Sequence, residues 1–322
     1  MFSSDSQVLL ADGSYKNITQ IANGDSVLNM NLEPVKVTEV KKVGTSPVVE
    51  VKYQNWYAPL YCAGNLQVFA QSKIDGEMSE TTWANASELT NNHYYTSERD
   101  IYKTRLSETF SVELANGKTL EASADAGLLF GLYAGYGSCS NDGKLVFRFG
   151  PNDSLVEQVQ QLLKNLFDAE TTTEKDEYCY KITTSDAGAA EFFTKFGSKL
   201  ERTVPKEYLC SNLEFAKGLF QGLVDYEPET KISRFIPVSR GMAEVFLTVC
   251  SLLHISFMND TPRIDKRNIQ VYPLFVEDQQ DDTVLGRVQS STLIDLELEM
   301  WSLSVECPTN SVIVNNMVVK SA

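Results

Sequence analysis

Apolar and polar residues alternate over short stretches in the first 125 residues of this 322-residue chain. The segment "VKVTEVKKV" (35–43) begins by alternating and is rich in β-branched residues, while Asp12-Gly13 and Asn116-Gly117 each separate two apolar stretches. Alternation with period two predicts half-buried strands, and Asp-Gly or Asn-Gly dipeptides predict tight hairpin turns. The N-terminal region is therefore predicted to be all β.

Near Gly127 the apolar residues change to helical spacing. In "SLVEQVQQLLKNLF" the residues Leu155, Val159, Leu162, Leu163 and Leu166 share one face, and Ser154 with Glu157 forms a capping box. Further helical segments are "AAEFFTKFG", "LEFAKGLFQGLVDY" and "MAEVFLTVCSLLHISF", and short strands such as "KLVFRFG" and "YCYKITT" lie between them. This region is predicted to be α/β.

The mixture of helices and short strands occurs twice, over about 127–197 and about 213–275, which indicates a weak internal repeat. After residue 282 the chain returns to strands, "STLIDLELEMWSLSVE" and "SVIVNNMVV". A β–α/β–β order suggests one domain inserted into a surface loop of another. We expect boundaries at 1–125, 126–285 and 286–322.

Charge and composition narrow the function. The net charge is −15, which argues against a generic binder of polyanions, because affinity for nucleic acids depends on Lys and Arg neutralising phosphates. Six cysteines are scattered without a C-x-x-C pair, and His93 and His254 have no second ligand at metal-binding spacing. We expect His254 to be packed on a buried helix. Neither a zinc site nor histidine-based catalysis is indicated.

No apolar run reaches the roughly 20 residues of a membrane-spanning helix, and the first residues lack the features of a signal peptide. We expect a soluble, intracellular protein, cytoplasmic or nuclear, that is monomeric and has no membrane partner.

Three segments carry a resemblance to a known family. The start "MFSSDSQVLLADGSYKNITQIANGDSVLNM", the segment "YCAGNLQVFA" and the end "WSLSVECPTNSVIVNNMVVKSA" together resemble the Hint splicing domain of inteins, and the middle resembles a LAGLIDADG homing endonuclease. The resemblance implies a horseshoe-like β fold built from both chain ends, enclosing two αββα-type pseudo-repeats. It also implies that the apolar last strand runs to a splice junction, beyond which a host extein would begin.

The resemblance assigns the first splicing residue to Met1. Inteins begin with Cys or Ser in the pattern Cys-x-x-Gly-Asp-Thr-x-Val, whose nucleophile attacks the preceding carbonyl. Asp5, Ser6 and Val8 align with this pattern. A thioether cannot make the attack. Splicing itself needs no cofactor.

The second splicing motif, Thr-x-x-His, supplies a histidine that destabilises the scissile amide. One register places Ala63 at the threonine and Leu66 at the histidine, and an alternative register places Cys62 and Asn65 there. Neither register contains an imidazole.

The terminal motif needs His-Asn before the first extein residue, because the asparagine cyclises and releases the intein. A strict register places Lys320 at the histidine, Ser321 at the asparagine and Ala322 at the first extein position; a register with one inserted residue places Ser321 and Ala322 at the histidine and asparagine. Both lack the cyclising amide, so the chain as written is predicted not to splice.

The LAGLIDADG resemblance implies two helices that pack through small residues, each delivering one carboxylate to Mg²⁺. The second copy, "FQGLVDYEP", places Gly222 at the helix contact and Glu227 at the metal-binding acid. The first copy, "LFGLYAGYG", matches at Gly131 but has Tyr136 at the acid position. A phenol does not replace a carboxylate on Mg²⁺, so cleavage is predicted to be weak or absent.

Double-stranded DNA is the partner that this resemblance implies. Between residues 126 and 290 there are 17 Lys and Arg against 23 Asp and Glu, a net charge of −6, whereas a DNA-cradling sheet is normally basic. A local basic stripe is one interpretation, and a solvated polar face is the other. The stripe would comprise Lys144, Arg148, Lys181, Lys231, Arg234, Arg263, Lys266 and Arg267.

Three functional hypotheses follow, of which the third is a purely structural remnant or protein-interaction module. The first is an intein-type splicing element that has lost splicing and carries a degenerate endonuclease. The second is a domesticated, non-splicing site-specific endonuclease or DNA-binding protein of the mating-type switching kind, with Glu227 functional and Mg²⁺ as its cofactor.

Overall fold

The structure is a computed structural model that describes residues 1–96, 106–140, 142–150, 153–175, 177–227, 232–259, 262–266, 268–277 and 285–321. The side chains of residues 96, 153, 154, 225–227, 232, 277 and 285 lie outside this description. Within the described residues no helix is both long enough and apolar enough to cross a membrane.

Packing divides the chain into two compact units. The β unit holds Met1–Ile101, Ser256–Thr261 and Gln279–Ala322, and the α/β unit holds Tyr102–Ile255 and Pro262–Asp278. The first division precedes the 125/126 boundary expected from the sequence, because a hairpin of β11 (Ser111–Glu113) and β12 (Thr119–Glu121) packs within the α/β unit. Its turn residue Asn116 donates from Nδ2 to the Phe167 carbonyl at 2.6 Å.

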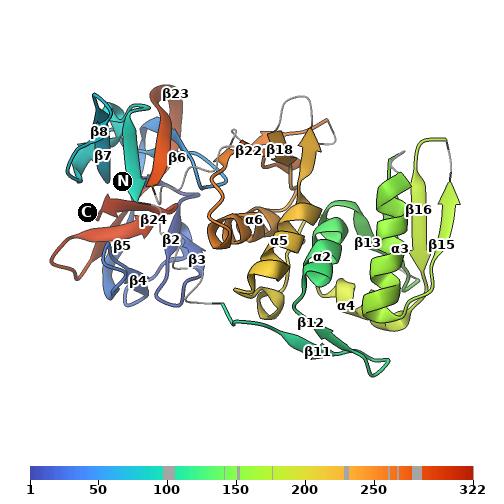
Figure 1. Cartoon of the computed structure of the whole chain (residues 1–322). Helices are drawn as coiled ribbons and strands as arrows, with labels where there is room; N and C mark the ends of the chain where they lie inside the picture. Colours follow the sequence, from blue (N-terminus) through green and yellow to red (C-terminus); the bar gives the residue numbers. More distant parts are fainter. Residues whose placement is uncertain are drawn as a thin grey trace. The chain divides into compact units, whose positions relative to one another are not determined.

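One large sheet forms most of the β unit, with the described strands in the order β3-β2-β24-β25-β7-β10-β23-β1-β6-β5-β4 and with β8 and β9 paired to β7 (Figure 1). The strand bounds are β1 Phe2–Ser3, β2 Gln7–Leu9, β3 Tyr15–Asn17, β4 Ser26–Leu28, β5 Pro34–Tyr53, β6 Leu60–Cys62, β7 Gln67–Ile74, β8 Glu77–Met78, β9 Thr82–Asn85, β10 His93–Thr96, β23 Leu285–Val305, β24 Ser311–Val314 and β25 Met317–Lys320. Two 3₁₀ turns, η1 (Ile18–Gln20) and η2 (Ala86–Glu88), lie between strands.

Both ends of the chain contribute to this sheet. Phe2 pairs with Trp301, and Val8 pairs with Val314. The C-terminal strand joins β7, because Val319 lies opposite Val68. Figure 1 shows the N and C labels in this unit, among strands coloured from both ends of the sequence.

Turn chemistry explains two of the hairpins. The Asp12-Gly13 prediction is confirmed, since β2 and β3 are antiparallel and Gly13 has a φ of 86°. Between β24 and β25, Asn315 and Asn316 have φ values of 49° and 63°, and a type I′ turn requires positive φ at both positions. The Gln7 backbone N–H donates to Asn315 Oδ1 at 2.7 Å, which ties this turn to the N-terminal strand.

The α/β unit repeats one order of elements. In each half a helix is followed by two antiparallel strands and a second helix, and the described strands form the sheets β13-β14-β16-β15 and β17-β18-β22. The bounds are α2 Ala124–Tyr136, β13 Gly137–Cys139, β14 Leu145–Phe149, α3 Asp153–Phe167, β15 Thr172–Lys175, β16 Tyr180–Thr184, α4 Ala187–Thr194, η3 Lys206–Tyr208, α5 Leu213–Leu223, β17 Asp225–Glu227, β18 Ile232–Phe235, α6 Arg240–Leu252, β20 Arg263–Ile264, β21 Gln270–Val271 and β22 Leu274–Glu277.

Helices α2 and α5 pack through glycines, as the small-residue pattern predicts. A Cβ atom on Gly131 would lie 2.6 Å from the Leu219 carbonyl oxygen, and one on Gly222 would lie 2.5 Å from the Leu128 carbonyl oxygen. Such distances are below any real Cβ contact, so only glycine permits this approach of the two backbones. Figure 1 shows α2 and α5 side by side.

One local prediction is wrong, and another lies outside the described residues. The described part of helix α3 begins at Asp153, and the Ser154 side chain of the expected capping box is not described. His254 is exposed and lies beyond the end of α6 with a φ of 56°, because the helix stops at Leu252. Apolar periodicity continues through "SLLHISF" in sequence, but the backbone leaves the helix two residues before the histidine.

Candidate functional site

The two N-terminal splicing positions lie side by side in the β unit. The Ala63 backbone N–H donates to the Met1 carbonyl oxygen at 3.2 Å, and Phe2 pairs with Cys62 across β1 and β6. Ala63 forms an apolar cluster with Val48 and Met300, and the Met1 side chain packs against that cluster. Apolar packing therefore fills the space around the two positions that the resemblance assigns to splicing.

The histidine position of the second motif is also apolar. Leu66 is 4% exposed, its N–H donates to the Ala63 carbonyl at 2.9 Å, and its carbonyl accepts from the Ala86 N–H at 2.7 Å. In the alternative register Asn65 is exposed and Cys62 is buried. Burial raises the pKa of the Cys62 thiol to about 12, and a buried neutral thiol is not a nucleophile.

Next to this turn lies the C-terminal strand. Lys320 Nζ donates to the Thr309 carbonyl at 3.1 Å and lies 4.5 Å from the Trp83 ring centroid, which fixes the cation by a cation–π contact. The Ser321 N–H donates to the Asn310 carbonyl at 2.8 Å, and its buried Oγ has no hydrogen-bond partner among the described residues. Ala322 lies outside the described residues.

Sequence reasoning missed one cysteine in the same region. Cys307 Sγ lies 2.9 Å from Thr309 Oγ1 and 3.5 Å from Asn29 Nδ2. Burial opposes ionisation of this thiol, but hydrogen bonds from Thr309 and Asn29 outweigh it and lower its pKa to about 7. The sequence contains no signal for this, because Asn29 is 278 residues away.

In the α/β unit, one of the two expected acid positions lies at the end of a helix and the other at the end of a strand. Tyr136 is the last residue of α2, and its ring packs against Phe149 with centroids 4.8 Å apart. Glu227 is the last residue of β17, and its side chain lies outside the described part of the chain. No group of three or more His, Cys, Asp or Glu side chains is close enough to hold a metal within the described residues. The described donors at the end of α2 do not fit Mg²⁺.

The described members of the expected basic set lie on several strands, and two of them have acidic partners. Arg148 and Lys181 lie opposite each other on β14 and β16, and Lys181 also pairs with Glu174 at 2.9 Å. Lys144 pairs with Asp142 at 2.7 Å. These acids neutralise part of the positive face, in agreement with the solvated-face interpretation for Lys144 and Lys181.

The other expected basic residues lie on different strands of the same unit. Arg234 is half-buried and lies opposite Asp225 across β17 and β18. Arg263 and Lys266 are exposed on and beside β20, in a separate two-stranded sheet. Lys231 and Arg267 lie outside the described residues. A role of any of them in DNA binding stays a prediction.

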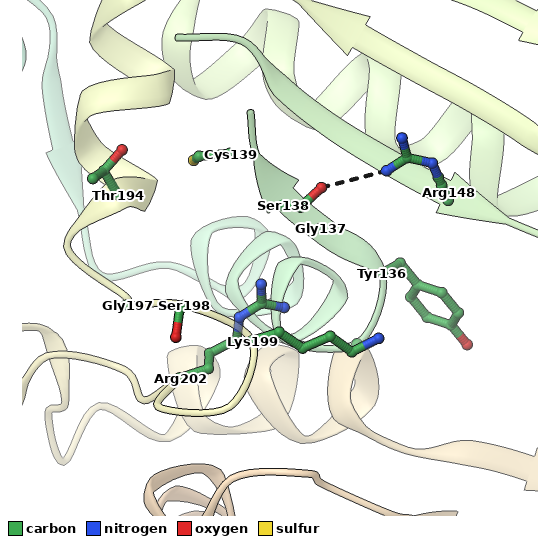
Figure 2. Close-up of a pocket in the computed structure, with 11 residues that line it drawn as sticks. Tyr136, Gly137, Ser138, Cys139, Arg148, Thr194, Gly197, Ser198, Lys199 and Arg202 are labelled. Atoms are coloured by element: carbon green, nitrogen blue, oxygen red, sulfur yellow. Dashed lines mark hydrogen bonds between the residues drawn. The ribbon is translucent and has the colours of Figure 1, made fainter. Parts of the chain in front are cut away.

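A cavity of about 560 Å³ lies at the C-terminal end of α2 (Figure 2). Sequence reasoning identified Tyr136 and Arg148 on its lining but missed Arg202, which is 4% exposed. Arg202 Nη1 donates to the carbonyls of Tyr133 and Ala134, both at 2.9 Å, and so caps the last turn of α2. Nothing in the sequence singles out this arginine, because its burial depends on contacts that form only in the folded chain.

A scan against protein-family models finds no match, and a search of the curated proteins finds none either. Among solved structures, two classes match different parts of the chain. The first class is inteins: the MchDnaB-1 intein, with 14% identity over 29% of this chain and a TM-score of 0.22, and a DnaB intein from Synechocystis sp., with 21% identity over 31% and a TM-score of 0.25.

The second class is homing endonucleases. Mesophilic variants of I-DmoI match with 18% identity over 49% of this chain and a TM-score of 0.35, and I-DmoI in complex with DNA and Ca matches with 18% identity, 49% coverage and a TM-score of 0.33. The similarities to the two inteins cover 65% and 69% of those chains, so the first spans less than two thirds of the MchDnaB-1 intein. The similarities to the two endonuclease structures cover 90% and 84% of those chains. These similarities are distant, so the interpretation of each unit rests on its own residues.

Proposed function

We propose that this chain is an intein-derived protein whose β unit is a splicing-type scaffold without splicing activity and whose α/β unit is a degenerate LAGLIDADG endonuclease domain. Its partners in this proposal are a host protein flanking the chain and a double-stranded DNA target. Kinship with yeast inteins, a monomeric state and a cytoplasmic or nuclear location belong to the same proposal.

Support for the loss of splicing comes from one observation. Met1 and Ala63 lie together, joined by a backbone hydrogen bond, and both contribute to an apolar cluster. The first acyl transfer needs a nucleophile at the first position and polar groups that destabilise the amide at the second. Thioether and methyl groups supply neither function.

The test of this proposal separates the first step from the later ones. The chain is placed between two exteins, and N-terminal cleavage by a thiol reagent is measured with and without the changes Met1→Cys, Ala63→Thr and Leu66→His. We expect no cleavage of the chain as written and cleavage of the triple variant. A variant with only Ala63→Thr and Leu66→His is the matched control, since it restores the surroundings without the nucleophile. Cleavage of the chain as written would contradict the proposal.

The second candidate function, a domesticated DNA-binding or nicking protein, is favoured by the retained glycine contact of α2 and α5. That contact holds the ends of both helices next to each other, where a two-acid site is built in the endonuclease family. Glu227 would supply one carboxylate for Mg²⁺. Tyr136 supplies none, so we expect nicking at most and not efficient double-strand cleavage.

A supercoiled-plasmid library in Mg²⁺ tests this second function. Conversion to the nicked form that is lost in Glu227→Gln would support a residual endonuclease, and binding of specific duplexes without nicking would support a DNA-binding protein. If the folded protein neither nicks the plasmid nor binds specific duplexes, the non-splicing scaffold is the only proposed function that remains.

A further inference from the structure

The cavity at the end of α2 has a strongly one-sided charge. Among the described residues that line it, Arg148, Lys199 and Arg202 are cationic, and none of the lining residues carries a carboxylate. Ser138 and Ser198 add hydroxyl groups to the lining. This occurs in a chain with a net charge of −15, where carboxylates are otherwise abundant. The cavity is therefore a local concentration of positive charge and hydrogen-bond donors.

Arg202 is the buried part of this lining. Its Nη1 binds two backbone carbonyls and its guanidinium carbon lies 4.7 Å from the Tyr133 ring centroid. Its Nε is buried and has no hydrogen-bond partner among the described residues, and none of the described ion pairs includes it. Burial lowers the pKa of this guanidinium. A buried charge is costly unless a counter-ion pairs with it, so an anion bound beside Arg202 would stabilise the guanidinium.

Figure 2 shows the Arg202 side chain reaching from its loop toward the end of α2, alongside Lys199, with Arg148 across the cavity and hydrogen-bonded to Ser138. The C-terminal end of a helix carries a partial charge of about −0.5, which repels an anion. Three cations outweigh that charge, and Arg202 already occupies two of the terminal carbonyls. Guanidinium and ammonium groups beside hydroxyls are the donor set that binds phosphate in proteins.

We propose that this cavity binds a phosphate-type oxyanion, with Arg202 at its inner wall and Arg148 and Lys199 at its rim. The volume of about 560 Å³ exceeds that of phosphate alone and leaves room for the organic part of a phosphorylated ligand. The phosphate could belong to a DNA backbone or to a free phosphorylated molecule. The site itself does not depend on DNA binding by the α/β unit, because inorganic phosphate is a sufficient probe.

The test titrates the full chain with inorganic phosphate at constant ionic strength and follows the side-chain Nε–Hε resonance of Arg202 by ¹⁵N NMR. We expect saturable binding that shifts this resonance, with chloride giving no shift. The rim variant Arg148→Ala/Lys199→Ala is expected to weaken the affinity about tenfold or more. Lys217→Ala is the matched control, because Lys217 is an exposed α5 lysine paired with Glu214 and outside the cavity lining, and it should bind like the parent chain.

Two results would overturn the proposal: no saturable phosphate binding by the folded parent chain, or an unchanged affinity in the rim variant. Since both rim residues are exposed, that variant keeps the test valid even where Arg202→Met fails to fold. A competition with a short duplex then distinguishes the two sources. Displacement of phosphate by the duplex assigns the site to a DNA phosphate, and simultaneous binding assigns it to a free phosphorylated ligand; the oxyanion site holds in both cases.

Discussion

The two units differ in what surrounds the residues that replace the expected chemistry. In the β unit, Ala63 and Leu66 are 6% and 4% exposed, and apolar packing fills the site. In the α/β unit, Tyr136 lies half-exposed at a helix end beside an open, cationic cavity. The first set of positions is part of an apolar core, whereas Tyr136 lies on the lining of a cavity. Polar substitutions should therefore cost more in the first site than in the second.

The largest effect should come from a substitution at the contact between helices α2 and α5. Unlike the half-exposed position of Tyr136, this contact leaves no room for a larger side chain. Gly222→Val places side-chain atoms where the Leu128 carbonyl and the Gly131 Cα already lie. We expect a loss of more than about 3 kcal/mol of unfolding free energy, since two backbones would have to separate. Denaturant-induced unfolding, monitored by hydrogen exchange of the backbone amides of α2 and α5, measures this loss of unfolding free energy.

Gly135→Ala is the matched control for that substitution. No atom lies within 4 Å of a Cβ at Gly135, which is on the same helix as Gly131. Alanine has a higher helix propensity than glycine, so stability should stay equal or rise by up to about 1 kcal/mol. Equal losses in Gly222→Val and Gly135→Ala would contradict the helix contact.

The next effect concerns the filled site of the β unit. Ala63→Thr adds a hydroxyl and a methyl group to a buried cluster with Val48 and Met300. We expect a loss of about 2 kcal/mol, from overpacking and from a hydroxyl without an assured partner. Gln67→Thr, at an exposed position of β7, should change stability by less than about 0.5 kcal/mol. Chemical denaturation compares the two, and a neutral Ala63→Thr would show that the site still accepts threonine.

A smaller effect is expected at the helix end. Tyr136→Asp removes the ring contact with Phe149 and puts a negative charge at the C-terminal end of α2, for a loss of about 1 kcal/mol. Tyr136→Phe keeps the ring contact and adds no charge, so it should lose less stability than Tyr136→Asp. Thermal unfolding of the three chains measures both. A loss at Tyr136→Asp larger than at Ala63→Thr would reverse the comparison between the units.

The smallest effect is a pH dependence at Cys307. Its folded pKa of about 7 is below the ordinary thiol value, so the thiolate stabilises the fold above that ordinary value, and this contribution is lost as pH falls through about 7. We expect alkylation of Cys307 by iodoacetamide to rise with a midpoint near pH 7, while Cys62 stays unmodified in the native chain. Peptide mass spectrometry identifies the modified cysteine. No increase at Cys307 between pH 6 and pH 8 would contradict the assignment.

Local patterns predicted the elements of both units well. The dipeptides Asp12-Gly13 and Asn116-Gly117 form hairpin turns, because few other residues adopt the positive φ found at Gly13 and Gly117. The close helix contact at Gly131 and Gly222 was expected only from the LAGLIDADG resemblance, and the structure has this contact.

The chemistry of the sites was less predictable because it depends on contacts distant in sequence. Nothing in the sequence marked Arg202, which is buried and bonded to the carbonyl of Tyr133, 69 residues earlier. The sequence alone predicts an ordinary buried thiol at Cys307, whereas hydrogen bonds from Asn29 and Thr309 lower the pKa of this thiol. The positions assigned to splicing could be named only through family resemblance, since Ala63 and Leu66 carry no chemical signal of their own.

The most direct test of the central claim, a splicing scaffold silenced at a few side chains, is ligation of flanking exteins by a chain with Met1→Cys, Ala63→Thr, Leu66→His, Lys320→His, Ser321→Asn and Ala322→Cys. The chain as written should give no ligated product, and the restored chain should give ligated exteins that are detected by mass. A folded, soluble restored chain that forms no ligated product and no cleavage intermediate would contradict the account.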